Sequence, residues 1–217
     1  MLSRRGIWFL LPSLGVILAG GIAVLLYSRE EVHLWLNSRH NPIADSLFKG
    51  WSYLGEGWVL VLLSLLLLLL YRIRTGLTVL ACYLLPGIAA QLVKLLLFRN
   101  TPRPLKYFEL KGLASELPLV PGVEVHLWNS FPSGHTAAAF GVLFGISLFL
   151  RSRILQFLLF LAGLGVAYSR IYLSQHFLID TLGGAVLGLA GGYLGWKWMS
   201  GIDRHWMEDP LITKLKK

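Results

Sequence analysis

The chain has 217 residues, of which 55% are hydrophobic and only 14% are charged, and its formal net charge is +9. Since soluble domains usually have about a quarter charged residues, this composition excludes an ordinary soluble globular protein. The single cysteine, Cys82, excludes an internal disulfide and a metal site built from several cysteines. We expect Cys82 to be a small buried residue.

The apolar segments predict an all-α integral membrane bundle of six transmembrane helices. The first run, 7–27, has 21 residues without a charge, enough to cross a hydrocarbon core of about 30 Å as a helix. Helices are required because a lipid-exposed backbone must satisfy its own hydrogen bonds. The spans are expected at about 7–27, 53–71, 76–98, 136–150, 154–172 and 178–199, within a single domain, 1–217.

The distribution of lysine and arginine predicts the orientation of these spans. With the N-terminus in the cytoplasm, the cytoplasmic side receives 11 basic and three acidic residues, and the other side receives eight of each. Because cytoplasmic loops are enriched in basic residues, both termini are expected in the cytoplasm and the first run is expected to be an uncleaved span. The loops 28–52 and 99–135 and the connection 173–177 then face outward. The positive charge is a topological signal, and no nucleic-acid partner is expected.

Polar residues gather at the outward ends of the last four predicted spans. They are Lys94, Arg99 and Arg103 after the third; Ser130, Ser133, Gly134 and His135 before the fourth; Ser169 and Arg170 at the end of the fifth; and His176 and Asp180 at the start of the sixth. Charged residues this close to a membrane are costly and usually functional. We expect these four helix ends to converge on one pocket.

The residue types in this pocket favour a phosphoryl group. Arginine offers a planar fork of donors to phosphate oxygens, and lysine adds a point charge. The sequence PSGH just before an apolar helix provides free N–H groups at a helix N-terminus, where the helix dipole favours an anion. Gly134 allows the backbone to approach such an anion closely.

Two histidines add reactive groups to this anion site. His176 and Asp180 are four residues apart, so they share a face of a helix. Asp180 could fix the tautomer of His176 and stabilise the imidazolium that forms when His176 acts as a nucleophile. His135 could donate a proton to the leaving oxygen near neutral pH.

Each group also has a purely structural interpretation when it is taken alone. Lys94 could extend to the membrane interface, Ser133 could only cap a helix, and Arg170 and Asp180 could form a structural ion pair. Four clusters on one face of the membrane argue against these separate explanations. His33 and His126 are expected to be solvated loop residues.

Three segments resemble the signature of the type-2 phosphatidic acid phosphatase superfamily, which also includes the vanadium haloperoxidases. The signature is a lysine followed by Arg-Pro, then Pro-Ser-Gly-His, then Ser-Arg-x5-His-x3-Asp. Here these parts are KLLLFRNTPRP, 94–104, PSGH, 132–135, and SRIYLSQHFLID, 169–180. The resemblance covers a core of about 90–185. The gap from Lys94 to Arg103 is eight residues, where the family has six, so either Lys94 or Arg99 fills the role of the first lysine.

This resemblance implies a phosphatase that needs no metal and no cofactor. His176 would attack phosphorus and form a phosphohistidine, Asp180 would orient it, and His135 would protonate the leaving group and then activate water. The phosphoryl oxygens would be bound by Lys94, Arg103, Ser133, Gly134 and Arg170.

A site at the outer membrane boundary predicts a membrane lipid phosphate as the substrate. The family allows phosphatidate, phosphatidylglycerol phosphate, a polyprenyl diphosphate or a lipid A phosphate, and the sequence favours none of them. The loop 105–129 is expected to cover the pocket or to lie on the interface. The expected location is a bacterial inner membrane, with the site facing the periplasm or exterior, and the oligomeric state is not predicted. Two other functions are a vanadate-dependent peroxidase-like enzyme and a non-catalytic binder or carrier of anionic lipids.

Overall fold

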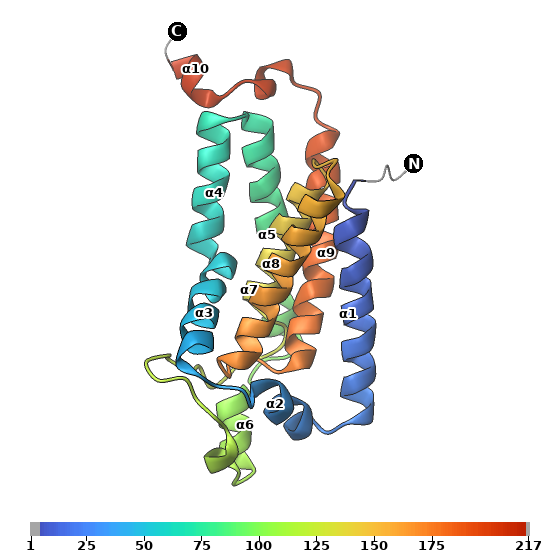
Figure 1. Cartoon of the computed structure of the whole chain (residues 1–217). Helices are drawn as coiled ribbons and strands as arrows, with labels where there is room; N and C mark the ends of the chain where they lie inside the picture. Colours follow the sequence, from blue (N-terminus) through green and yellow to red (C-terminus); the bar gives the residue numbers. More distant parts are fainter. Residues whose placement is uncertain (1–4, 216–217) are drawn as a thin grey trace.

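The computed structural model describes residues 5–215, which form a helical bundle (Figure 1). The α-helices are α1 (Ile7–Leu26), α2 (Arg29–Asn37), α3 (Pro42–Ser52), α4 (Gly57–Leu70), α5 (Ile73–Leu96), α6 (Pro104–Leu110), α7 (Gly134–Ser147), α8 (Arg153–Tyr172), α9 (Leu178–Ser200) and α10 (Leu211–Leu215). Three short 3-10 helices are η1 (Tyr53–Gly55), η2 (Ala114–Glu116) and η3 (His205–Glu208). Within residues 5–215, the β structure is one isolated bridge between Pro102 and Trp128. The all-α prediction is therefore confirmed for this part of the chain.

Four helices, α1, α5, α8 and α9, are long and apolar enough to cross a membrane. A fifth candidate is the bent pair of Pro42–Gly55 and Gly57–Leu70, whose two parts meet at 56°. The expected span 136–150 corresponds to α7, which has only 14 residues, shorter than the roughly 20 that a span requires. The chain is thus an integral membrane bundle with four or five candidate spans within residues 5–215, and the number six stays a prediction.

The segment 28–52 differs from the expected outward loop because most of it is helical. Ser28 and Glu31 form a reciprocal cap at the start of α2, and the Asn41 side chain accepts a hydrogen bond from Ala44 N at the start of α3. These local caps begin helices in a region too polar to predict as a span. The span expected at 53–71 corresponds to η1 and α4, which together with α3 form the bent pair that is broken at Glu56.

Helix α7 lies in the middle of the bundle and packs closely on α9 and α5. A Cβ atom at Gly188 would lie 2.7 Å from the carbonyl oxygen of Ala137, and one at Gly192 would lie 2.5 Å from that of Gly141. Small residues allow helices in membranes to approach in this way. On the other side of α7, Phe9 of α1 is fully buried against Phe140, with ring centroids 5.7 Å apart.

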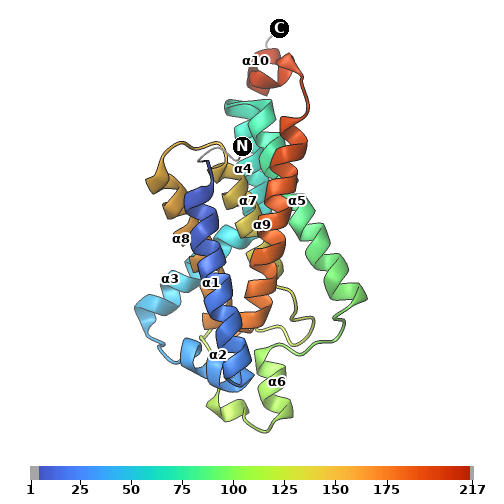
Figure 2. The same cartoon turned by 90° about the vertical axis from the view of Figure 1, so that its right-hand side faces the viewer.

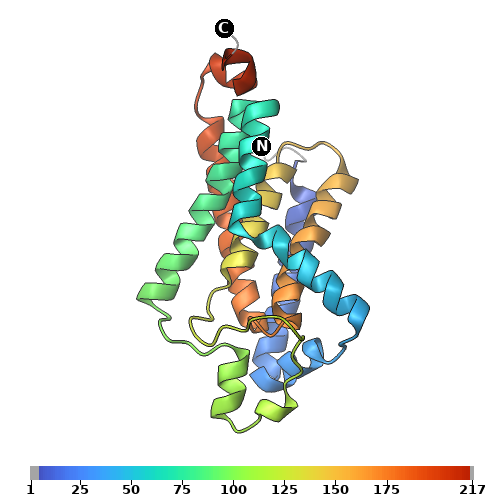
Figure 3. The ribbon, with the colours of Figure 1, turned by 90° about the vertical axis from the view of Figure 1, so that its left-hand side faces the viewer.

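The end of the bundle near α6 is more open than its centre. Helix α1 begins and α9 ends at one end of the bundle, and α6 lies beyond the opposite end (Figure 1). Figures 2 and 3 show that the C-terminal half of α5 leans away from the other helices toward this opposite end. Figure 3 also shows α3 leaning the other way. Because these two elements diverge, α7, α8 and α9 present their ends between them.

Candidate active site

The structure brings the predicted polar clusters together at the end of the bundle where α5 and α8 finish and α7 and α9 begin. A cavity of about 510 Å³ lies there, within the range of small-molecule sites. Six of the predicted site residues line it: Lys94, Arg103, Gly134, His135, Arg170 and His176. These groups can therefore contact one common ligand.

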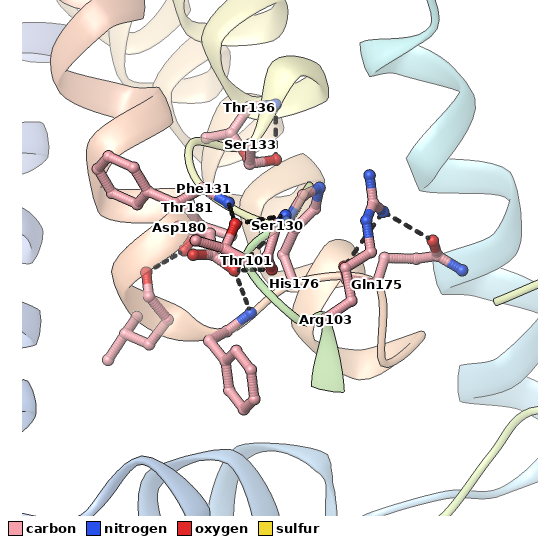
Figure 4. Close-up of polar contacts among 12 residues, drawn as sticks. Thr101, Arg103, Ser130, Phe131, Ser133, Thr136, Gln175, His176, Asp180 and Thr181 are labelled. Atoms are coloured by element: carbon pink, nitrogen blue, oxygen red, sulfur yellow. Dashed lines mark hydrogen bonds and ion pairs between the residues drawn. The ribbon is translucent and has the colours of Figure 1, made fainter. Parts of the chain in front are cut away.

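His176 and Asp180 form the most buried part of the site (Figure 4). The distance from His176 Nδ1 to Asp180 Oδ2 is 3.5 Å, and the two side chains are 2% and 4% exposed. Asp180 Oδ2 also accepts hydrogen bonds from Ser130 Oγ at 2.5 Å and from Phe177 N at 2.9 Å. Two hydrogen bonds thus fix the carboxylate beside Nδ1 of His176, an atom with no hydrogen-bond partner of its own among residues 5–215. Nε2 is left as the nitrogen available for a ligand.

Burial holds His176 in its neutral form. It lowers the pKa of His176 to about 3, and the cations Arg103 and Arg170 act in the same direction, while Asp180 opposes the shift. A neutral imidazole retains the lone pair that a nucleophile needs. His176 lies in the short connection between α8 and α9. There its backbone N–H donates to the backbone carbonyl oxygen of Arg170 at 3.0 Å.

Ser133 and Gly134 have different positions relative to the cavity. Ser133 is fully buried, its hydroxyl accepts from Thr136 Oγ1 at 3.0 Å, and its N–H donates to the Asp180 carbonyl oxygen at 2.9 Å (Figure 4). The Ser133 side chain therefore caps α7 and lies outside the cavity lining. Gly134, the first residue of α7, lines the cavity, so the free N–H groups of the helix start are on the cavity side.

Three cations line the cavity, and each lies mostly within the protein. Arg103 Nε donates to Trp128 O at 2.9 Å and its NH1 donates to Gln175 O at 3.2 Å (Figure 4). Arg170 NH1 donates to Ser52 Oγ at 2.5 Å, and its buried Nε has no partner among the described residues. Burial lowers the pKa of Arg103, and Asp180 opposes this shift. Clustered cations with unused donors are suited to bind an anion.

Lys94 and Arg99 are separated by the structure. Lys94 is 8% exposed and lines the cavity from α5, whereas Arg99 is exposed beyond the end of that helix. Helix α5 continues to Leu96, so Lys94 is held on the helix while Arg99 lies in the turn that follows it. Lys94 is thus the residue positioned for the role of the first lysine.

Several residues near the site were not predicted from the sequence. Glu56 Oε1 lies 2.9 Å from His135 Nε2, and Ser52 and Gln175 hold the two arginines. No pattern in the sequence pairs 52–56 with 135 or 170, because the contact depends on the break between α3 and α4. The prediction for His33 was wrong: α2 buries it to 1% exposure between Phe108 and Phe177. His126 is exposed as expected, and it lines the outer part of the cavity.

Known proteins are similar to this chain in sequence and in fold. The family model described as the PAP2 superfamily matches residues 75–204, which include the whole expected core. The undecaprenyl-diphosphatase BcrC of Bacillus subtilis is 31% identical over 94 residues, which are 41% of this chain. That match spans 47% of BcrC, about half its length.

Two solved structures have the same arrangement of helices. LpxE of Aquifex aeolicus superposes with a TM-score of 0.63 and 28% identity, over 77% of this chain and 93% of LpxE. A PAP2 type phosphatidylglycerolphosphate phosphatase of Bacillus subtilis superposes with a TM-score of 0.63 and 22% identity, over 94% of this chain and all of that protein. The second likeness extends the shared fold to the N-terminal helices.

Proposed function

Because the chain belongs to the PAP2 superfamily, we propose that it is an integral membrane phosphatase that hydrolyses a phosphate monoester or diphosphate on a lipid. The main observation that supports this proposal is the set of residues that line the cavity. His135, His176, Lys94, Arg103 and Arg170 line it together, and Asp180 lies directly behind His176. This set contains a nucleophile, its orienting carboxylate, an acid and three cations for a phosphoryl group.

The proposed reaction has two steps. In the first step, His176 Nε2 forms a bond to phosphorus, the bond from phosphorus to the leaving oxygen breaks, and His135 gives its proton to that oxygen. The His176 Nδ1–H faces Asp180, which stabilises the positive charge that develops on the ring. In the second step, water attacks phosphorus, His135 takes a proton from the water, and the bond between nitrogen and phosphorus breaks to release phosphate.

The cations and the start of α7 have the complementary role of binding the phosphoryl oxygens. As charge redistributes over these oxygens in the transition state, donors already fixed by the protein stabilise it without reorganising. Gln175 and Ser52 hold Arg103 and Arg170 in place through one guanidinium nitrogen each. We therefore assign Lys94, Arg103, Gly134 and Arg170 to direct phosphate binding and Ser133 to the structure of the α7 start.

A lipid substrate is supported by the apolar part of the cavity lining. The lining residues of α5 include four apolar side chains that are exposed at the surface of the bundle: Leu84, Ile88, Leu92 and Leu95. Their spacing places them on one face of the helix. The phosphate can thus occupy the polar end of the cavity while an acyl or prenyl chain lies against α5 and reaches the surrounding lipid.

The proposed orientation of the protein in the membrane rests on the distribution of basic residues. Basic residues concentrate on the side where both termini are expected, so the active site would face the periplasm or exterior of a bacterial inner membrane. Candidate substrates include an undecaprenyl diphosphate, as for BcrC, and a phosphatidylglycerol phosphate, as for the phosphatase from Bacillus subtilis. Phosphatidate and a lipid A phosphate are the other two candidate substrates.

The test is phosphate release by the purified full-length protein from this panel of four lipid phosphates. We expect release from at least one of them, unchanged by EDTA and inhibited by orthovanadate, and no release by the His176→Ala variant. Release that persists in His176→Ala, or that requires a divalent metal, would contradict the proposed chemistry. Bromide oxidation with added vanadate would indicate the peroxidase-like alternative, and lipid binding without any hydrolysis would indicate a binder or carrier.

A further inference from the structure

The break between α3 and α4 places one carboxylate beside the active-site cavity. Glu56 is the single residue between η1 and α4, where the two parts of the bent pair meet at 56°. Its backbone is extended, and its side chain makes no cap to the helix that follows. The carboxylate is therefore free to contact another element.

Glycines on both sides of Glu56 allow this break to approach the site. A Cβ atom at Gly55 would lie 3.1 Å from the backbone oxygen of His135, and one at Gly57 would contact Tyr83 Oη of α5. Gly55 and Gly57 both line the cavity. The absence of side chains at these two positions brings the Glu56 backbone close to both α7 and α5.

The contact that results is a hydrogen bond between two half-buried side chains. Glu56 Oε1 lies 2.9 Å from His135 Nε2, and the two side chains are 36% and 28% exposed. Glu56 lies outside residues 75–204, the part of the chain matched by the family model. The motif that contains His135 therefore gives no indication of this partner.

The charges around His135 explain why such a partner is needed. His135 shares its cavity with Arg170 from α8, Arg103 from the segment before α6, Lys94 from α5 and His176 from the connection before α9. Asp180 lies behind His176 and already accepts hydrogen bonds from Ser130 and Phe177. Three cations disfavour a protonated imidazole, whereas a carboxylate at hydrogen-bond distance favours it. Glu56 is thus the acidic group that can offset these cations at His135.

We propose that Glu56 is a positioning residue that holds His135 through Nε2 and keeps it protonated for the first chemical step. This inference rests on the proposed phosphatase function. Glu56 accepts the hydrogen of Nε2–H and stays a carboxylate throughout. His135 Nδ1 then gives a proton to the leaving oxygen and takes one back from the attacking water. Glu56 makes no contact with the phosphoryl group, so it acts only through His135.

The test compares Glu56→Gln with the wild type across a range of pH, using the full-length protein. A glutamine keeps the shape and removes the charge, so we expect kcat to fall at least about tenfold at neutral pH, which corresponds to about 1.4 kcal/mol, with KM little changed. Because a carboxylate favours protonated His135, its loss should move the alkaline limb of the kcat profile by about one unit toward lower pH. Glu56→Asp, which keeps the charge, should restore part of the rate.

The matched control is Glu116→Gln, the same change at an exposed residue of η2, which should leave both the rate and the pH profile unchanged. Orthovanadate should inhibit Glu56→Gln as strongly as the wild type, because the phosphate-binding groups are intact. An unchanged pH profile in Glu56→Gln, with or without a lower rate, would overturn the proposal. That result would mean that Glu56 only supports the packing of the break.

A second measurement tests the contact without any enzyme activity. Diethylpyrocarbonate modifies unprotonated imidazole, and mass spectrometry can follow its reaction at His135. We expect this reaction to begin at a lower pH in Glu56→Gln than in the wild type, and coincident curves would overturn the inference. If the wild type hydrolyses no lipid of the panel, the proposed function fails, and this measurement still decides the role of Glu56.

Discussion

The site contains two histidine–carboxylate pairs that are built in opposite ways. His176 and Asp180 are four residues apart at the start of one helix, and both are almost fully buried. His135 and Glu56 are 79 residues apart on different elements, and both are about one-third exposed. In the mechanism proposed above, the nucleophile His176 must be held in one position and kept neutral, which burial achieves. The proposed acid, His135, exchanges protons with a leaving group and with water and must stay accessible, as it does.

Removing each histidine separately is the strongest test of the different roles proposed for His176 and His135. His176→Ala should lower phosphate release by about 10⁴-fold or more, since loss of a nucleophile removes the covalent route. With a nitrophenyl phosphate, whose leaving group needs no proton, His135→Ala should still release about one equivalent of nitrophenol per enzyme and then stall. A rapid-quench measurement of this burst checks both variants, and a burst in His176→Ala would contradict the assignment.

Asp180→Asn tests the buried pair from the carboxylate side. The asparagine retains the size of the side chain but removes the charge that fixes the His176 tautomer, so kcat should fall by about 10³-fold. Ser130→Ala is the matched control. It removes one of the two hydrogen-bond donors to the Asp180 carboxylate and leaves the carboxylate itself, and we expect a loss of about tenfold. If kcat falls equally in the two variants, the negative charge of Asp180 is not what supports catalysis by His176.

Lys94→Ala and Arg99→Ala test which of these two cations binds the phosphate. Lys94 lines the cavity and Arg99 is exposed outside it, so Lys94→Ala should lower kcat/KM by about 100-fold and raise the concentration of orthovanadate needed for inhibition. Arg99→Ala removes the same charge nearby and should stay within about twofold of the wild type. The measurement is steady-state kinetics with the lipid that the wild type hydrolyses fastest. If Arg99 and not Lys94 binds the phosphate, Arg99→Ala should show the larger loss of kcat/KM.

A separate expected effect concerns stability at low pH and not the rate of catalysis. Burial lowers the pKa of His33 to about 4 and that of His176 to about 3, so between about pH 6.5 and 4 the unfolded chain binds protons that the folded chain does not. Stability should fall as pH falls through this window, by up to about 1.4 kcal/mol per pH unit for each histidine. In His33→Phe the decrease in melting temperature from pH 7.5 to 5 should be smaller.

The control for His33→Phe is His205→Gln, at an exposed histidine in η3, which should melt like the wild type at both pH values. Phenylalanine suits the site of His33 because two aromatic rings, Phe108 and Phe177, already surround it. A melting curve of His33→Phe with the same dependence on pH as the wild type would show that His33 is not buried in its neutral form.

The sequence by itself determined the membrane class, the helical fold and the residues of the central motifs. Apolar runs of about 20 residues permit only helices in lipid, and the spacing of His176 and Asp180 places both on one helix face. These features depend on neighbours along the chain, and a sequence shows such neighbours directly. The same holds for PSGH, because the start of α7 follows from its position just before an apolar run.

Only the tertiary structure decided which distant groups meet. The break at Glu56, the burial of His33, the position of Lys94 in the cavity lining with Arg99 outside it, and the position of Ser133 outside the cavity all depend on how the helices pack. The physical reason is that a contact such as that between Glu56 and His135 joins elements with no common periodicity. It exists because glycines let a bent helix approach α7, and that approach is a property of the assembled bundle.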